Sequence, residues 1–327
     1  MIVTRTPVRI PLGGGGTDLP AYYSKHGGFL VSAAIDKHIY IMVNKRFENS
    51  IRISYSKTEI VNSVDDIEHP IVREALRLVG ITGGIEIVSI ADVPSNSGLG
   101  TSSSFAVGLL NALHTFKGEY VSPVTLAQEA CHIEIDVLRE PIGKQDQYLG
   151  ALGGITCLDI DKQGQVSATS LLLPNHTMDE LESNTLIFYT GIRRSASQVL
   201  AKQSESLSRD EYEVREAMHT IKQIGISIKA ALEQGDLHTF GELLDSHWQT
   251  KKRLSSAISF GEVDRWYEIA RKNGALGGKL MGAGGGGFLM FYCNNNKNKL
   301  REAMEAEGLQ EMRFKVDFGG SKALVNF

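Results

Sequence analysis

The sequence is poor in cysteine, in net charge and in long hydrophobic runs, and each shortage excludes a class of protein. Three cysteines, Cys131, Cys157 and Cys293, lie far apart in 327 residues, without the spacing of a disulfide framework or a zinc site. The 34 basic and 38 acidic residues leave a net charge of −4, which favours neither nucleic acid nor an anionic membrane as a partner. No signal sequence or run of 18 apolar residues is present, so we expect a soluble, cytoplasmic protein.

Glycine, by contrast, is abundant, and one glycine-rich segment organises the chain. Residues 97–104 have the sequence SGLGTSSS and directly precede an apolar run, residues 105–116. Gly98 and Gly100 permit a tight turn beside a ligand, and the unpaired N–H groups of a helix start attract anions. We therefore predict a phosphate-binding loop before a buried helix. A flexible linker ending in a helix cap is the alternative, since the segment matches neither the Walker pattern nor the dinucleotide fingerprint.

Two further glycine clusters flank this loop in the sequence. The four glycines at 13–16 are costly in conformational entropy, which indicates a backbone that passes close to a ligand or to another segment. Asp18 follows them, either as a binding group or as an Asx-turn or helix cap. The cluster at 277–287 lacks the polar residues of a linker, so we expect it to pack against the glycines at 13–16 or against the ligand.

Two carboxylates are candidates for chemistry. A predicted helix over residues 123–140 places Glu134 on the same apolar stripe as Ala130 and Leu138. A carboxylate facing the core needs a metal ion or a buried basic partner, unless it lies at the edge of the stripe and extends to water. Asp146 is expected in a glycine-flanked loop, as a scaffold-held functional group or as a solvated turn residue.

Hydrophobic periodicity predicts a mixture of strands and helices. The expected strands are residues 3–12, 29–35, 39–47, 51–55, 85–90, 155–160, 185–189, 288–293 and 312–318. The expected helices are residues 70–79, 105–116, 123–140, 195–257 with a break at 235–236, 261–273 and 297–307. The stretch 164–184 is rich in loop residues and is predicted to contain the boundary between two domains, 1–172 and 173–327.

Three segments together resemble a known family. They are PVRIPLGGGGTD at 7–18, PSNSGLGTSSS at 94–104 and KLMGAGGGG at 279–287, which in this order resemble the three motifs of the GHMP small-molecule kinases. The first segment and residues 143–147 are most similar to the D-glycero-D-manno-heptose 7-phosphate kinases, and next to fucokinase-like enzymes. The resemblance implies an α+β fold of two domains, one like domain 2 of ribosomal protein S5 and one ferredoxin-like, with the active site between them.

The resemblance also implies roles for individual residues. ATP phosphates would lie along the loop, Mg²⁺ would stabilise the transferring charge, and Asp146 would orient or deprotonate the acceptor hydroxyl beside Arg9, which would keep it ionised. The implied nucleotide-binding residues are Ser97, Gly98, Leu99, Gly100, Thr101, Ser102, Ser103 and Ser104. The implied metal ligands are Ser102 or Ser103 together with Glu134.

The acceptor implied by the resemblance is D-glycero-D-manno-heptose 7-phosphate, phosphorylated by ATP at its anomeric hydroxyl to give the 1,7-bisphosphate for nucleotide-activated heptose and surface glycans. A sugar phosphate needs a second cationic site, for which Arg193, Arg194 and Lys144 are candidates and for which surface charge is the alternative. The residues expected at the acceptor are Gly16, Thr17, Asp18, Lys144, Arg193, Gly285 and Gly286. An L-fucokinase-like or other sugar 1-kinase, a catalytically silent sugar sensor, and a homodimeric assembly stay open.

Overall fold

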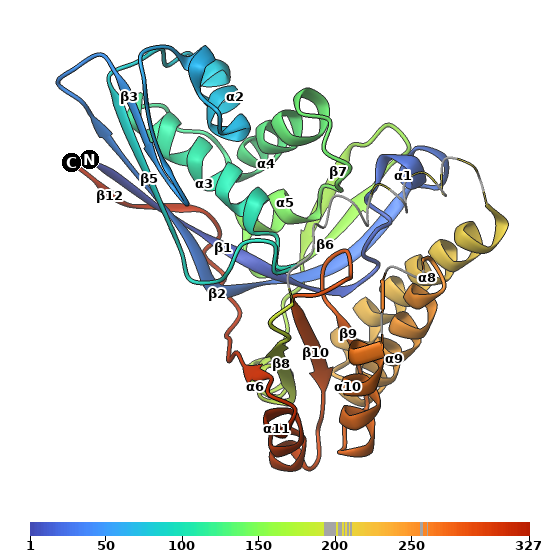
Figure 1. The fold of residues 1–327 in the computed structure, drawn as a ribbon. Coiled ribbons are helices and arrows are strands. Elements are labelled where there is room, and N and C mark those ends of the chain that lie inside the picture. The colour runs from blue at the N-terminus through green and yellow to red at the C-terminus, as the bar shows by residue number, and fades with distance from the viewer. Residues whose placement is uncertain are drawn as a thin grey trace.

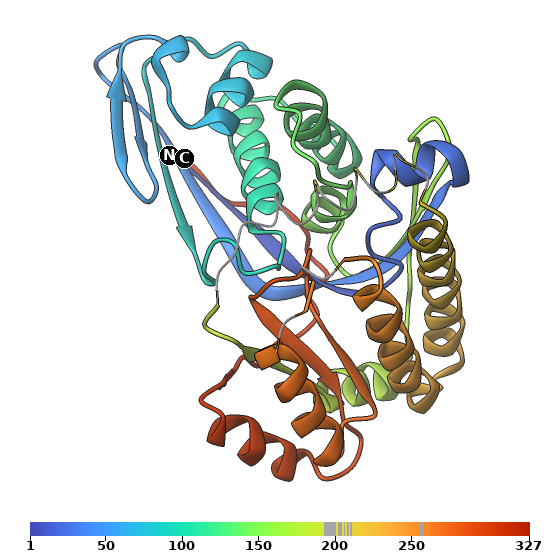
Figure 2. The same cartoon turned by 45° about the vertical axis from the view of Figure 1, so that its right-hand side comes forward.

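The computed structural model describes residues 1–192, 201, 205, 207, 209, 211–255, 258–259 and 261–327. Its strands form one sheet of eight strands and one of four, with helices packed against both (Figure 1). The two ends of the chain lie side by side at one edge of the larger sheet (Figures 1 and 2). Within the described residues, no helix is long and apolar enough to cross a bilayer.

The eight-stranded sheet has the order β12-β1-β2-β5-β3-β4, and β6 and β7 extend it from the other end of β2. Its neighbours are antiparallel, except for the parallel pair β3 and β5. The strands are β1 (Ile2–Gly13), β2 (Gly28–Lys45), β3 (Ile51–Ser54), β4 (Thr58–Val61), β5 (Ile85–Ala91), β6 (Ile155–Ile160), β7 (Val166–Ser170) and β12 (Lys322–Asn326).

Helices α3 and α5 cover one face of this sheet over β1 and β2, and α2 and α4 lie outside them (Figure 1). The glycine at 108 lets α3 approach β1 closely, since an added Cβ would lie 2.7 Å from the Thr6 hydroxyl oxygen. The helical segments of this part are α1 (Pro20–His26), η1 (Val64–Asp66), α2 (Pro70–Val79), α3 (Thr101–Phe116), α4 (Pro123–Cys131), the π-helix η2 (His132–Val137) and α5 (Gln145–Leu152).

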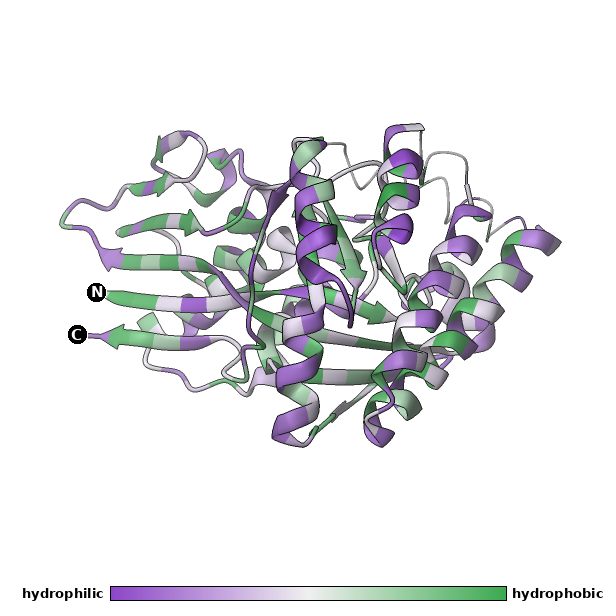
Figure 3. Cartoon of the chain, turned by 90° about the horizontal axis from the view of Figure 1, so that it is seen from below, coloured by the Kyte–Doolittle hydropathy of each residue, from purple (hydrophilic) through white to green (hydrophobic). Residues whose placement is uncertain are grey.

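The four-stranded sheet has the antiparallel order β11-β8-β10-β9, with α9 packed directly on β9. Its strands are β8 (Thr185–Tyr189), β9 (Gly277–Leu280), β10 (Phe288–Tyr292) and β11 (Gln310–Glu311). The helices are α6 (Asn175–Asn184), α8 (Tyr212–Gln234), α9 (Leu237–Lys252), α10 (Gly261–Lys272) and α11 (Lys297–Ala306). Hydrophobic residues predominate along the strands, whereas the outlying helices alternate polar and apolar residues, as expected for helices with one face on a core (Figure 3).

The two parts are joined by a close contact between backbones. An added Cβ at Gly225 in α8 would lie 2.9 Å from the Cα atom of Gly14, and one at Gly14 would lie 2.1 Å from the Phe29 carbonyl oxygen. The glycine run after β1 therefore packs between α8 and β2, as its entropic cost led us to expect of a segment that approaches other backbone.

Three differences from the sequence-based expectations concern secondary structure near the site. The predicted helix over 123–140 divides into α4 and a π-helix, where Leu138 N–H bonds to the Ile133 carbonyl at 2.9 Å. Asp146 lies in the first turn of α5 rather than in a loop, because α5 begins as soon as the glycine at 143 is passed. The pair of predicted strands 29–35 and 39–47 is one continuous strand, β2.

The prediction of a final strand at 312–318 is wrong. That segment makes one bridge, between Ile35 and Val316, and the last strand is instead β12, which pairs with β1. The stretch predicted to be loop-rich contains β7 and α6, and β4 is an additional short strand. Because β12 returns to the first sheet, the C-terminal residues complete the structure of the N-terminal half. The division at residues 172 and 173 stays a prediction.

The contact of α9 with β9 can be tested by adding one methyl group. A Cβ at Gly277 would lie 2.1 Å from the Gly241 carbonyl oxygen and 2.6 Å from the Asp245 amide nitrogen, which are backbone atoms that cannot move away cheaply. We expect Gly277→Ala to destabilise the protein by about 1–3 kcal/mol, as overpacking does. Thermal unfolding would measure this. Gly261→Ala, where an added Cβ meets no atom within 4 Å, is the matched control; equal melting temperatures for the two variants would contradict the expectation.

Candidate active site

A cavity of about 410 Å³ opens between the two sheets, and its walls come from distant parts of the chain. Strand β1, the start of α3, the π-helix and α5 supply one side, and α9, β9 and the loop after β9 supply the other. The predicted site residues that line it are Arg9, Gly16, Asp18, Gly98, Gly100, Thr101, Ser102, Ser103, Glu134 and Asp146. The fold thus brings together residues from the three glycine-rich segments, the π-helix with Glu134 and the start of α5.

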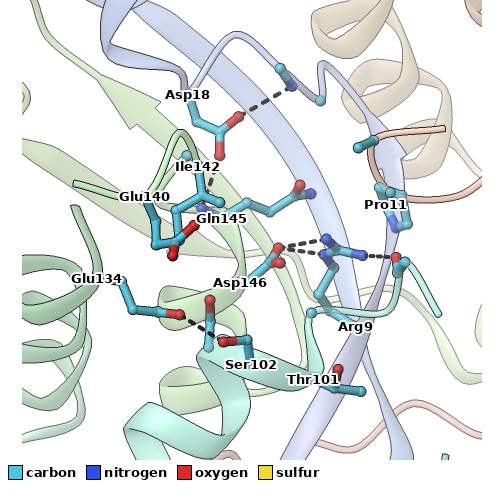
Figure 4. A pocket seen from close by; sticks show the side chains of 18 of the residues that line it. Arg9, Pro11, Asp18, Thr101, Ser102, Glu134, Glu140, Ile142, Gln145 and Asp146 are labelled. Atoms are coloured by element: carbon cyan, nitrogen blue, oxygen red, sulfur yellow. Dashed lines mark hydrogen bonds and ion pairs between the residues drawn. The ribbon is translucent and has the colours of Figure 1, made fainter. Parts of the chain in front are cut away.

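An ion pair between Arg9 and Asp146 lies at the centre (Figure 4). Both Nε and a terminal nitrogen of the guanidinium contact Oδ1 of Asp146, at 2.7 and 2.6 Å, and the other terminal nitrogen donates to the Gly98 carbonyl at 2.7 Å. Arg9 is only 6% exposed. The planar guanidinium therefore fixes one carboxylate oxygen and the turn of the glycine loop in one geometry.

The second oxygen of Asp146 lies beside the start of α3. Gly100, the residue before α3, has a φ of 78°, and an added Cβ there would lie 2.8 Å from Asp146 Oδ2. A side chain at position 100 would be strained and would also displace the carboxylate. Glycine at this position therefore allows an acidic group to lie directly next to the helix N-terminus that was predicted to bind an anion.

The loop 97–104 does not expose all of its residues. Ser97 and Leu99 are fully buried, and the Ser104 hydroxyl donates to the Pro7 carbonyl at 2.9 Å, which ties the end of the loop to β1. The predicted packing of the glycine cluster at 277–287 occurs against this loop rather than against the glycines at 13–16. An added Cβ at Gly282 would lie 2.6 Å from the Gly98 Cα atom.

Glu134 is buried but is not paired with a basic group among the described residues. It is 1% exposed, accepts hydrogen bonds from Ser102 at 3.1 Å and from Gln147 at 2.7 Å, and Ser103 also bonds to it. Burial raises its pKa to about 7, against the lowering effect of these hydrogen bonds. The projection of residues 123–140 placed this carboxylate correctly on the inner face, and its partners are hydroxyl and amide groups.

Asp18 lines the same cavity as Glu134, with Glu140 and Ile142 between them (Figure 4). Its two oxygens accept from the backbone N–H groups of Gly16, at 3.2 Å, and of Gln145, at 3.0 Å. Burial raises its pKa, and the neighbouring charge of Asp146 adds to that rise. The side chain thus fixes the start of α5, next to Asp146, and lines the same cavity.

Four basic residues line the cavity that were not among the predicted site residues: His247 and Lys251 of α9, Lys279 of β9, and His69 at the start of α2. A pattern in the sequence could have found the first two. Leu237, Phe240 and Leu244 form the buried stripe of α9, and positions 247 and 251 continue it at helical spacing. The same test that singled out Glu134 on its own helix applies here.

Other predicted residues lie away from the cavity or outside the described chain. The Thr17 hydroxyl donates to the Gly14 and Phe29 carbonyls, and Lys144 Nζ bonds to the Gly164 carbonyl beside the Tyr23 ring, in a second and smaller cavity. Gly285 and Gly286 pack against backbone of residues 258 and 192. Arg193 and Arg194 lie outside the described residues.

The donor set at Glu134 suits Mg²⁺. This ion prefers oxygen ligands and is usually held by one or two carboxylates together with substrate phosphates and water. Glu134 and the hydroxyls of Ser102 and Ser103 meet at the start of α3, where N–H groups are available for phosphate. Among the residues that the structure describes, no three acidic, histidine or cysteine side chains gather for a protein-only metal cage. The arrangement therefore fits a metal ion that is held partly by these side chains and partly by a bound phosphate.

Comparisons with known proteins agree with the geometry. The GHMP kinases N terminal domain model matches residues 67–154, and the GHMP kinases C terminal model matches residues 228–310. The chain is also 31% identical to the D-glycero-alpha-D-manno-heptose 7-phosphate kinase of Campylobacter jejuni subsp. jejuni serotype O:2, over 96% of both chains. The chain belongs to the GHMP kinase family. This confirms the α+β fold of two domains and the family assigned from the three motifs.

Two further relatives of this GHMP kinase are informative. A crystal structure of a D-glycero-D-manno-heptose 1-phosphate kinase from Bacteriodes thetaiotaomicron superposes with a TM-score of 0.82 at 25% identity, with 100% of both chains covered. The L-fucokinase/L-fucose-1-P guanylyltransferase of Bacteroides fragilis is 30% identical over 91% of the chain, which covers 35% of that protein. The GHMP kinase described here thus spans about a third of the bifunctional relative.

The buried carboxylate of Glu134 leads to a pH-dependent prediction for the protein without nucleotide or metal. The pKa of Glu134 is raised from 4.5 to about 7, so ionisation of this carboxylate destabilises the folded protein. This loss of stability is absent below pH 4.5 and complete above about pH 7. Glu134→Gln removes this cost, so between pH 5 and pH 8 the variant should gain on the order of 3 kcal/mol relative to the wild type.

Thermal unfolding at pH 5, 6, 7 and 8 measures this difference. At pH 8 we expect the variant to melt at or above the melting temperature of the wild type. This difference in melting temperature should shrink toward pH 5. A variant less stable by the same amount at every pH would show that the Glu134 hydrogen bonds, rather than its charge, dominate.

Proposed function

We propose that this chain is an ATP-dependent kinase that transfers the γ-phosphate of ATP to the anomeric hydroxyl of D-glycero-D-manno-heptose 7-phosphate, giving the 1,7-bisphosphate for nucleotide-activated heptose and surface glycans. One observation carries the proposal: Asp146, fixed by Arg9, stands between an anion-binding loop with Glu134 and a part of the cavity that contains Asp18. The heptose phosphate kinases named among its relatives support the choice of acceptor. Because ATP and sugar phosphates are its substrates, we place it in the cytoplasm.

The phosphates of ATP would bind at the start of α3. The N–H groups of residues 100–103, the helix dipole and the Ser102 and Ser103 hydroxyls offer donors to anionic oxygens there. Mg²⁺, held by Glu134 and the phosphates, would supply charge stabilisation for the transferring group. Binding of a cation would also favour the ionised form of Glu134, whose pKa burial raises to about 7.

The acceptor hydroxyl would lie against Asp146. Its oxygen attacks phosphorus in line with the departing ADP oxygen, and its proton passes to Oδ2, because Oδ1 is held by Arg9. Arg9 is oriented by the Gly98 carbonyl as well, so it can also face negative charge on the transferring group. Asp18, next to Asp146 through Gln145, is the group that would hydrogen-bond sugar hydroxyls.

Asp146→Asn tests the central role. The amide cannot accept the proton and pairs less well with Arg9, so we expect turnover to fall by about 10²-fold or more while nucleotide binding is retained. ADP release in a coupled assay, together with calorimetry for a nucleotide analogue, measures both. Asp159→Asn, an exposed change in β6, is the control. Turnover within a factor of two of the wild type would remove Asp146 from the mechanism.

The acceptor is tested by comparing sugars. We expect the kcat/KM of the wild type to be at least tenfold higher for heptose 7-phosphate than for the free heptose or L-fucose, because each charge-assisted bond to a phosphate contributes about 1.5–3 kcal/mol. The product is identified by nuclear magnetic resonance as the 1,7-bisphosphate. A preference for L-fucose would favour the fucokinase alternative, which the Bacteroides fragilis relative supports. Absence of ADP release with any sugar would favour a silent sensor.

A further inference from the structure

The basic residues His247, Lys251 and Lys279 form a cationic cluster at one end of the cavity, which the proposed mechanism does not use. His247 and Lys251 are one helical turn apart in α9, and β9 carries Lys279 alongside them. The glycines at 241 and 277 let helix and strand touch through their backbones, which places the three side chains together. All three line the same cavity as Asp146.

No acidic side chain among the described residues neutralises this cluster. Lys279 is 1% exposed and donates to the Leu12 carbonyl at 2.8 Å, and Lys251, which is partly buried, donates to the Gly282 carbonyl. His247 is 2% exposed, and neither ring nitrogen has a hydrogen-bond partner. Carbonyl oxygens satisfy hydrogen bonds but carry no net charge, so the charged forms of these buried groups are left without compensation.

The pKa shifts within the cluster also favour the binding of an anion there. Burial lowers the pKa of Lys251 to about 8, with a further contribution from Arg9, and it lowers the pKa of Lys279 well below its usual range, where Lys251 and Arg9 add to the effect. Burial and the two lysines likewise lower the pKa of His247. An anion placed among these groups would favour their charged forms and would gain strong hydrogen bonds in return.

The cluster lies on the side of Asp146 away from Glu134. In Figure 4, Glu134 and Ser102 lie on one side of Asp146, and Arg9 and Pro11 lie on the other. Lys279 bonds to the carbonyl of the residue after Pro11, so it belongs to the side away from the carboxylate that suits the metal. The nucleotide phosphates already have the helix N-terminus and the hydroxyls at 102 and 103 for partners.

We propose that His247, Lys251 and Lys279 bind the terminal phosphate of the acceptor, so that a sugar phosphate spans the distance from this cluster to Asp146. The inference rests on the proposed function, because it assigns a role to a part of the same cavity. It also moves the phosphate site from Arg193, Arg194 and Lys144, which were the candidates in the sequence, to side chains of α9 and β9. Lys144 points into a different cavity, where it bonds to the Gly164 carbonyl.

The experiment compares Lys251→Met and Lys279→Met with the wild type, using heptose 7-phosphate and free heptose as acceptors. Methionine keeps the length of the side chain and removes the charge. Lys252→Met is the matched control, since Lys252 points to Asp264 and the Trp248 ring rather than into the cavity. Thermal unfolding verifies the fold of each variant; a buried, uncompensated lysine replaced by methionine should leave stability unchanged or higher.

We expect the ratio of kcat/KM for the two acceptors to fall roughly tenfold to a hundredfold in each cavity variant, with little change in Lys252→Met. A ratio that survives both changes but falls in Arg193→Ala would overturn the inference and leave the acceptor assignment intact. A rise in KM for ATP with an unchanged ratio would also overturn it, because the cluster would then serve the nucleotide.

Binding of inorganic phosphate separates failure of this inference from failure of the proposed function. Calorimetry is performed with a saturating nucleotide analogue, so that the loop at 97–104 is occupied. One outcome is that the wild type binds phosphate and fails to distinguish the two sugars, while Lys251→Met and Lys279→Met no longer bind phosphate. In that case the anion site stands and the heptose acceptor fails. Phosphate binding that is equal in the wild type and both variants would contradict the site itself.

Discussion

The contacts of Arg9 are the constraint on which the rest of the site depends. One side chain joins β1 to α5 through Asp146 and to the loop before α3 through the Gly98 carbonyl. Arg9 is 89 residues from Gly98 and 137 residues from Asp146 in the sequence, so the local geometry exists only when the large sheet and its covering helices are complete. Because the guanidinium is buried and planar, a small rotation of α5 or of the loop would break more than one short contact. The position of Asp146 is therefore a consequence of the whole N-terminal half.

The second constraint is the desolvation of charge inside the cavity, which acts in opposite directions at its two ends. Burial raises the pKa of Glu134 and lowers that of Lys279, so each group is held in the fold at a cost to its charged form. A cation at the first end and an anion at the second would each reduce that cost. Such a cavity suits a reaction in which a metal-bound polyphosphate and a second phosphate compound meet, with Asp146 between them.

Much of this site can be predicted from the sequence. Dense glycine clusters indicate close approach of backbone, a run of hydroxyl residues at a helix start indicates an anion, and Glu134 interrupts an apolar stripe. Lys251 is not predicted, because the helical pattern of residues 195–257 identifies the apolar face of α9 without singling out the polar residues that continue it. Asp146 was expected in a loop because the glycine at 143 suggested one, but the helix begins two residues later. The pairing of β12 with β1 joins the two ends of the chain, and no local pattern specifies so distant a partner.

The glycine clusters explain why residues from both halves of the chain can form a single cavity. A Cβ on Gly282 would lie 2.6 Å from the Gly98 Cα atom, and one on Gly98 would lie 2.7 Å from the Met281 carbonyl oxygen. A Cβ on Gly287 would likewise lie 2.2 Å from the Ser97 carbonyl oxygen. Side chains at these positions would separate the loop at 97–104 from β9 and would move Lys279 away from Arg9. Backbone contact keeps the cationic cluster and the Arg9–Asp146 pair on one cavity, which is the arrangement that a substrate with charge at one end and a reacting hydroxyl at the other requires. Glycine at these positions is thus what keeps the cationic cluster close to the Arg9–Asp146 pair.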